Sequence, residues 1–192
     1  EDNENLRELI RHLLESQFRI ITAEEGQEAI QLLTEQSVDL VVSDIMMEGM
    51  DGLALCQWIK NTFEYCHIPV ILLTAKHGDS SRIEGYNSGA DCYITKPFSF
   101  QVLQARIDNL LKQQDLRSSR YRNQVVIEVE KLDYTSMDEQ FLRQAIACVN
   151  AHIADSSFSR TDFVREMNTS RTVLTEKLKS LTGLTPAAFV LD

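Results

Sequence analysis

The chain has 192 residues, 43% of them hydrophobic, so it can bury a core as one large domain or two small ones. Its formal net charge of -10 argues against a protein that simply coats nucleic acid. Residues 1–135 hold 13 Lys and Arg against 22 Asp and Glu, whereas residues 136–192 hold 6 against 7, so only the first segment is strongly acidic.

No stretch of the sequence has the run of apolar residues that a membrane-spanning helix needs, and no signal-peptide pattern opens it. The 4 cysteines are scattered, without the spacing of a zinc site or a disulfide framework. We therefore expect a soluble, cytoplasmic protein with reduced cysteines and no membrane contact by this segment.

Helical and strand patterns alternate along the first part of the chain. Helices are predicted at 3–15, 26–37, 53–61, 80–88 and 99–114, and strands at 18–23 and in the runs that end at Asp44, Thr74 and Lys96. This alternation predicts an α/β fold with a doubly wound parallel sheet.

Polar residues stand where the predicted strands end. Asp44 closes a buried apolar run, and Thr74 and Lys96 close the next two, while Glu1 and Asp2 directly precede the first helix. In a parallel sheet these groups converge beyond the carboxyl ends of the strands, where ligands bind. An acid in that position can also be only a turn former or a helix cap, and the strand around Asp44 does not decide between the two.

The combination of three carboxylates, one hydroxyl and one ammonium suits phosphoryl transfer. Glu1, Asp2 and Asp44 could hold Mg²⁺, which prefers oxygen ligands. An aspartate can attack a phosphoryl group as nucleophile, while Lys96 and Thr74 supply donors to the transferring oxygens.

Four motifs occur in order along the chain: Glu1-Asp2, Ser-Asp-Ile-Met-Met…Met-Asp-Gly, Leu-Leu-Thr-Ala, and Gly-Ala-Asp-Cys-Tyr-Ile-Thr-Lys-Pro-Phe. Together they resemble the receiver domain of bacterial response regulators over residues 1–114. The resemblance implies a flavodoxin-like, CheY-like fold with sheet order 2-1-3-4-5. It also places the first, central strand before Glu1, so we expect that the sequence lacks residues upstream.

The resemblance gives roles to the matching positions. Asp44 becomes the phosphoacceptor that receives a phosphoryl group from a histidine kinase. The other implied roles are Mg²⁺ ligands (Glu1, Asp2, Asp44 and the backbone carbonyl of Met46), contacts to the phosphoryl oxygens (Thr74 and Lys96) and the aromatic switch position (Tyr93). Glu48 stands where the family usually has proline, which should change loop stiffness rather than chemistry.

The C-terminal part reads as an all-α segment after a linker at 115–137, in which residues 125–129 form a short apolar run. A long amphipathic helix starts at Asp138. Two short helices follow, at 159–167 and from Ser170 to Leu181, with Ser170 as cap and Gly183 as stop. The pattern fits a helix-turn-helix or a plain helical hairpin.

Residues 138–192 resemble part of an AraC-type helix-turn-helix domain, through Phe-Val-Arg-Glu-Met-Asn-Thr-Ser-Arg…Leu…Lys-Leu-Lys-Ser-Leu-Thr-Gly-Leu-Thr-Pro. In such motifs the second helix enters the major groove. The implied base readers are Arg171, Thr172 and Thr175, and the residues that meet the backbone or pack their stems are Lys177 and Lys179. Glu176 stands where the family is commonly basic, and the family uses two such motifs where this chain has one. We therefore expect little specific DNA binding from the chain alone.

These features predict a non-enzymatic response regulator that couples phosphorylation of Asp44 to transcription, with a homodimer on DNA half-sites. A receiver followed by an AraC-type segment also resembles the C-terminal part of hybrid two-component sensors, whose kinase lies upstream in the same chain. Two alternatives remain. A haloacid-dehalogenase-type phosphatase would need an aspartate where Met46 stands, and a flavin carrier would bring a phosphate against the acidic residues 1–4.

Overall fold

The computed structural model describes residues 1–75, 89–122, 136–153, 155 and 158–191. The chain forms two compact units. One contains Glu1–Thr62 and Ile68–Leu111, and the other contains Phe63–His67 and Lys112–Asp192. Among the described residues, no helix combines the length and the apolar character needed to cross a membrane.

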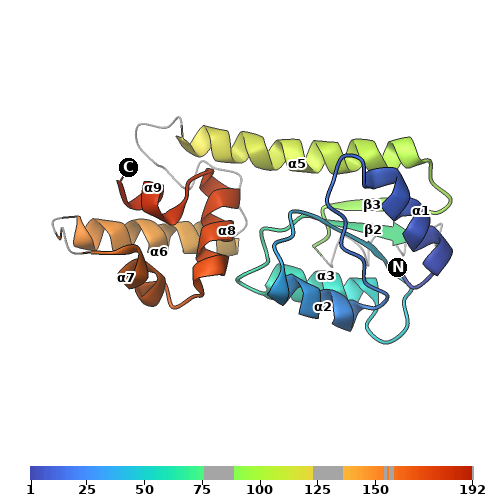
Figure 1. The fold of residues 1–192 in the computed structure, drawn as a ribbon, viewed down its shortest axis with the longest axis horizontal. Coiled ribbons are helices and arrows are strands. Elements are labelled where there is room, and N and C mark those ends of the chain that lie inside the picture. The colour runs from blue at the N-terminus through green and yellow to red at the C-terminus, as the bar shows by residue number, and fades with distance from the viewer. Residues whose placement is uncertain (76–88, 123–135, 154, 156–157, 192) are drawn as a thin grey trace. The chain divides into compact units, whose positions relative to one another are not determined.

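The first unit is built on a parallel sheet (Figure 1). Its strands are β1 (Val41–Asp44), β2 (Val70–Thr74) and β3 (Cys92–Thr95), in the order β1-β2-β3. All five residues of β2 are buried, as expected for a strand with a neighbour on each side. The three predicted strands that end in polar residues are therefore neighbours, in the order that the receiver resemblance implies.

Helices cover both faces of this sheet (Figure 1). They are α1 (Glu4–Leu14), α2 (Gly26–Glu35), α3 (Gly52–Asn61) and α5 (Phe100–Arg122). Leu14 of α1 and Leu103 of α5 pack with Ile71, Leu73 and Ile94 in one cluster, so α1 and the start of α5 cover the same face. In Figure 1, α2 and α3 lie on the opposite face.

The predicted strand at 18–23 is wrong, because these described residues form no strand. In the sheet order of the receiver family this segment pairs with the first strand, and none of the described residues forms that strand. The backbone N–H and C=O groups of residues 18–23 therefore have no strand to pair with in the described part of the chain. The hydrophobic pattern was still informative, since Phe18 and Ile20 pack against the core cluster.

Two other sequence predictions differ from the structure or lie beyond it. The last helix of the α/β segment extends to Arg122, past the predicted end at Gln114 and into the predicted linker. It contributes residues to both units. The predicted helix at 80–88 and the apolar run at 125–129 lie outside the described residues.

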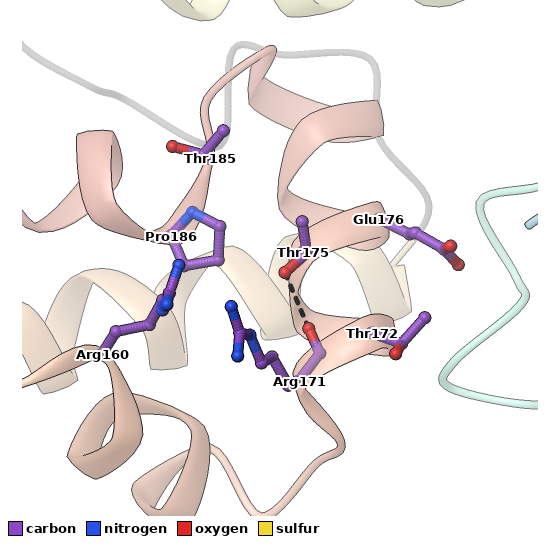
Figure 2. Close-up of a pocket in the computed structure, with 7 residues that line it drawn as sticks. All are labelled: Arg160, Arg171, Thr172, Thr175, Glu176, Thr185 and Pro186. Carbon is purple, nitrogen blue, oxygen red and sulfur yellow. Dashed lines mark hydrogen bonds between the residues drawn. The ribbon is translucent and has the colours of Figure 1, made fainter.

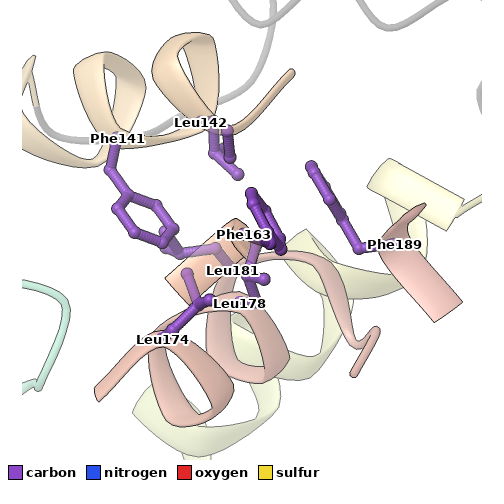
Figure 3. Close-up of a cluster of buried hydrophobic side chains, with 8 residues drawn as sticks. Phe141, Leu142, Phe163, Leu174, Leu178, Leu181 and Phe189 are labelled. Atoms are coloured by element: carbon purple, nitrogen blue, oxygen red, sulfur yellow. The ribbon is translucent and has the colours of Figure 1, made fainter. Parts of the chain in front are cut away.

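The second unit is all helical, with α6 (Ser136–His152), α7 (Arg160–Glu166), α8 (Arg171–Thr182) and α9 (Pro186–Leu191). Figure 3 shows the aromatic and leucine side chains at its centre. The buried members of this cluster are Phe141, Leu142, Ala145, Phe163, Leu174, Leu178, Leu181 and Phe189.

The predicted ends of α8 are confirmed. The Ser170 hydroxyl accepts a hydrogen bond from the backbone N–H of Val173 at 3.2 Å, and Gly183 ends the helix in the left-handed conformation with φ 71°. Helix α9 was not predicted. It begins at Pro186, since proline is well suited to the first turn of a helix, and the Thr185 hydroxyl accepts from the N–H of Ala188 at 3.3 Å.

One glycine is required where the loop after β1 enters α3. A Cβ on Gly52 would lie 1.9 Å from the backbone oxygen of Asp44 and 2.9 Å from the Ser43 hydroxyl. The Gly52 N–H also donates to the carbonyl of Ile45 at 3.0 Å. The loop can fold tightly against the end of β1 only because this position has no side chain.

We predict that Gly52→Ala destabilises the protein by about 1–3 kcal/mol, because the strand end must move to admit the methyl group. Chain entropy alone predicts the opposite sign, a gain of about 0.4–1 kcal/mol. Urea unfolding of the variant and the wild type decides between the two. A stabilised variant would show that the loop after β1 can move to admit the methyl group without loss of folding free energy.

Candidate functional site

The register of the sheet brings three of the predicted site residues to one edge. Asp44 pairs with Leu73 of β2, and Thr74 pairs with Thr95 of β3. Beyond the strand ends, the N–H of Lys96 donates to the carbonyl of Thr74 at 2.7 Å. Asp44, Thr74 and Lys96 therefore all stand at the carboxyl edge, as predicted for a ligand site in a parallel sheet.

Lys96 joins two of the predicted acids. Its Nζ donates to Asp44 Oδ2 at 2.7 Å and to Glu1 Oε2 at 2.9 Å. The Asp44 and Glu1 side chains are only 9% and 7% exposed. Burial lowers the pKa of Lys96, but the hydrogen bonds to Asp44 and Glu1 outweigh it, and the net pKa is raised. The lysine is therefore held in its charged form beside the predicted phosphoacceptor.

The three acids form a cluster that suits a divalent cation. Ligand oxygens of Glu1, Asp2 and Asp44 all lie within 4.8 Å of one another. Asp44 is buried and Asp2 is exposed, so the cluster is reached from solvent. An all-carboxylate donor set fits a hard cation such as Mg²⁺ better than a soft one.

The other residues that the receiver resemblance singled out lie on the strands of the sheet or in the loop after β1. The N–H of Met46 donates to Asp44 Oδ1 at 3.3 Å, and this bond orients the carboxylate. Thr74 is 8% exposed. Tyr93 lies in the middle of β3 and is half-buried, and Glu48, which replaces the family's usual proline, is exposed in the loop after β1.

One residue of the fourth motif has a structural role that the sequence did not reveal. Asp91 Oδ2 accepts a hydrogen bond from the N–H of Val70 at 2.7 Å and an ion pair from Lys60 at 2.7 Å. Lys60 also donates to the carbonyl of Ile68 at 2.8 Å. Asp91 and Lys60 thus tie the end of α3 to the start of β2, the strand that carries Thr74.

In the second unit, the predicted base readers line one pocket of about 410 Å³ (Figure 2). It is formed by Arg160, Arg171, Thr172, Thr175, Glu176, Thr185 and Pro186. The Thr175 hydroxyl donates to the carbonyl of Arg171 at 2.7 Å. Arg160 had no predicted role, because it lies on the helix before the one that was expected to read DNA. Lys179 is exposed on α8.

Lys177 does not have the exposure that a contact with DNA needs. It is 0% exposed, and its Nζ lies 3.2 Å from Asp138 Oδ1 and 3.2 Å from Cys66 Sγ. It also donates to the carbonyl of Phe63, whose ring centroid is 4.3 Å away. The assignment of Lys177 to the DNA backbone is therefore not supported, and its role is internal. The sequence could not show this, since the partner segment 63–67 is remote along the chain.

Burial raises the pKa of the Cys66 thiol to about 11, and the nearby Asp138 carboxylate adds to the rise. The thiol is therefore protonated at neutral pH, and its Sγ can donate to Asp138 Oδ1 at 3.3 Å. Lys177, Asp138 and Cys66 thus form one buried polar cluster in which each group has a partner.

Residues 1–108 match the family described as the response regulator receiver domain. This match covers more than half of the chain, so the chain belongs to the response regulator receiver family. The fold and the grouped motif residues of the first unit agree with this membership.

Two curated relatives illustrate where such a segment occurs. The chain is 36% identical over its full 192 residues to "Histidine kinase P4" of Formosa agariphila, but it spans only 14% of that protein. It is 32% identical over 158 residues, 82% of the chain and 66% of the relative, to "Heme response regulator HssR" of Staphylococcus haemolyticus.

Solved structures share the fold of the first unit. The receiver domain of a signal transduction histidine kinase from Syntrophus aciditrophicus aligns with TM-score 0.57 and 33% identity over 66% of this chain and 92% of that one. A receiver domain protein from Clostridium thermocellum aligns with TM-score 0.54 and 30% identity over 60% of this chain and 93% of that one.

We predict that Asp138→Ala destabilises the second unit by about 3–5 kcal/mol, because it leaves the Lys177 charge buried and unpaired. The double variant Asp138→Leu, Lys177→Met should regain most of this loss, since it removes both charges. The exposed pair Glu139–Arg143, on the same helix, offers a control: Glu139→Ala should cost less than about 1 kcal/mol.

Urea unfolding followed by circular dichroism measures all three variants. An Asp138→Ala variant no less stable than Glu139→Ala would mean that Lys177 reaches solvent and that the buried pair is not maintained.

Proposed function

We propose that Asp44 accepts a phosphoryl group from a histidine kinase and that this event controls DNA binding by the helical segment of the same chain. The observation that carries the first part is the contact between Lys96 and Asp44 at the carboxyl edge of the sheet, beside two further acids. Membership of the receiver family supports the same reading, since a receiver implies a histidine kinase as phosphodonor.

In the proposed reaction, a carboxylate oxygen of Asp44 attacks the phosphorus atom of a phosphohistidine. The new P–O bond forms as the P–N bond breaks, and the electron pair leaves with the imidazole of the kinase. Asp44 is buried and is oriented by the N–H of Met46, so its attacking oxygen is held in place before the donor arrives.

Lys96 and Thr74 act on the transferred group. The Lys96 ammonium, which neutralises the Asp44 carboxylate in this structure, is placed to donate to a phosphoryl oxygen once the carboxylate has become an acyl phosphate. The Thr74 hydroxyl, at the end of the neighbouring strand, is the second proposed donor. Glu1, Asp2, Asp44 and the carbonyl of Met46 would hold Mg²⁺, which neutralises charge on the transferring oxygens when it is bound.

Lys96 and the proposed cation site share two acids, Glu1 and Asp44, and differ in the third. Lys96 reaches Glu1 and Asp44, whereas the cation site also includes Asp2, which accepts no hydrogen bond from Lys96 in the part of the chain described. Removing the lysine therefore leaves all three acids in place for the metal.

We propose that the second unit is the output. Helices α7 and α8, with a tight turn between them, form the helix-turn-helix of a partial AraC-type domain, in which α8 enters the major groove of DNA. The support is the exposure of Arg171, Thr172 and Lys179 on α8. Phosphorylation would set dimerisation, and so the spacing of DNA half-sites, with Tyr93 as the switch residue.

The two curated relatives are compatible with two settings for this segment, a separate response regulator or the C-terminal part of a hybrid sensor. We propose the hybrid setting, because the relative that matches the whole chain is named a histidine kinase and is far longer than the chain. The phosphodonor would then be a kinase domain of the same polypeptide, at the cytoplasmic side of a membrane.

We predict that incubation with acetyl phosphate and Mg²⁺ adds one phosphoryl group and that Asp44→Asn abolishes the addition, because the amide is not a nucleophile at this site. Intact-mass spectrometry with and without Mg²⁺ measures this. The exposed acid Asp51, which caps α3, gives the matched control, and Asp51→Asn should still be labelled. Labelling that survives Asp44→Asn would place the acceptor elsewhere.

We also predict that Lys96→Ala leaves Mg²⁺ binding nearly intact but impairs phosphotransfer. Mg²⁺ at 100 times its dissociation constant should stabilise both the wild type and Lys96→Ala by about 2.7 kcal/mol. Thermal unfolding across a Mg²⁺ series reports the binding, with the exposed lysine variant Lys112→Ala as control. Loss of the Mg²⁺ effect in Lys96→Ala alone would contradict the separate roles of the lysine and the acids.

A further inference from the structure

Two arginines converge in the pocket on α8. Arg160 is the first residue of α7 and Arg171 the first residue of α8, so the turn between the helices brings both to one place. Figure 2 shows their guanidinium groups on the same side of the pocket, next to the ring of Pro186. Both arginines are exposed, whereas Pro186 is buried and fixes the wall beside them.

Neither arginine has an acidic partner in the described part of the chain, although their neighbours do. Arg165, on α7, pairs with Asp162 at 2.6 Å, and Arg143, on α6, pairs with Glu139 at 2.8 Å. Arg160 and Arg171 form no such pair among the residues that the structure describes. Two like charges that face one pocket without a counter-charge leave a site for an anion.

The acid in the pocket lining does not fill this site. Glu176 lies on the next turn of α8, and Figure 2 shows its carboxylate pointing away from the two guanidinium groups. The hydroxyl of Thr185 and the ring of Pro186 lie on the arginine side instead. The pocket therefore has an arginine side and an acidic side, and the anion site is the former.

We propose that Arg160 and Arg171 together hold one backbone phosphate of duplex DNA. This inference rests on the proposed DNA-binding function of α8 and changes the role of one residue in it. Arg171 becomes a phosphate ligand rather than a base reader, and Thr172 and Thr175 remain to face base edges. Arg160, which the sequence did not single out, becomes the second half of the clamp.

The geometry favours a phosphate of DNA over a free phosphate ion. Arginine suits phosphate because its planar fork donates two parallel hydrogen bonds. Both arginines are exposed, however, and a single exposed ion pair contributes little in water. A duplex brings further contacts along α8 at the same time, and these contacts can hold the phosphate in the pocket.

The test is the salt dependence of binding to a short duplex of random sequence, measured by fluorescence anisotropy on the full chain. Each neutralised phosphate contributes about 0.9 to the slope of log affinity against log salt between about 50 and 200 mM. If the two arginines share one phosphate, the double variant Arg160→Gln, Arg171→Gln should lower the slope of log affinity against log salt by about 0.9 in total. Two separate phosphates would lower it by about 1.8.

The matched control is Arg143→Gln, which removes the same charge from an exposed arginine of the same unit that is already paired. It should leave the slope unchanged, while Arg160→Gln and Arg171→Gln should each weaken binding roughly tenfold at low salt. Circular dichroism should show equal thermal midpoints for all the variants, because the substituted side chains are exposed.

The same measurement distinguishes a failure of the proposed DNA binding from a failure of the proposed shared phosphate. Wild-type protein that shows no salt-dependent binding at any salt concentration would overturn the DNA-binding output and the clamp with it. Wild-type binding that the double variant does not change, or changes by a slope of about 1.8, would overturn only the shared phosphate.

A second experiment compares duplexes that differ in sequence. Arg171→Gln should weaken binding to all of them by the same factor, because a phosphate contact carries no sequence information. A loss of affinity confined to certain sequences would restore Arg171 as a base reader.

A third experiment titrates the protein with inorganic phosphate and follows the titration by NMR. It should give no saturable shift at millimolar concentration. Saturable binding of phosphate by a protein that does not bind DNA would overturn the assignment to DNA.

Discussion

The parallel register of β1, β2 and β3 is the constraint on which the candidate receiver site depends. Because the side-chain period of a strand is two, a slip of one residue in β2 would turn Thr74 to the other face of the sheet and separate it from Asp44. The register is held at both ends. At the start of β2, Asp91 and Lys60 fix Val70 and Ile68, and beyond its end the N–H of Lys96 bonds to Thr74.

Two lysines among the described residues, Lys96 and Lys177, show why residue type alone does not indicate function. Lys96 is partly exposed, contacts two acids of a site open to solvent and can exchange one partner for another. Lys177 is fully buried, and its acid, thiol and carbonyl partners leave no approach for a ligand. The same ammonium group is therefore proposed to serve phosphoryl transfer in the first case and contributes to internal packing in the second, and exposure separates the two.

Much of the first unit could be predicted from the sequence, because its signals are local. The buried strand runs, the polar residues that end them and the caps are all read from neighbouring residues, and Asp44 and Lys96 meet as expected. The failures involve distant partners. None of the described residues pairs with the predicted strand at 18–23, and the internal role of Lys177 depends on segment 63–67, more than a hundred residues earlier in the chain.

Charge balance connects the two proposed sites. At the sheet edge, Lys96 forms ion pairs with two acids of the cluster. The raised pKa of Lys96 reflects the same electrostatic attraction that would hold a divalent cation. In the pocket lined by α7 and α8 the sign is reversed, since Arg160 and Arg171 form no ion pair among the described residues, while Arg143 and Arg165 are paired within their own helices. A protein surface keeps unpaired like charges together at a cost, and that cost is recovered when a ligand of opposite charge binds. The excess of acids at one site and of arginines at the other therefore indicates a cation for the first and an anion for the second.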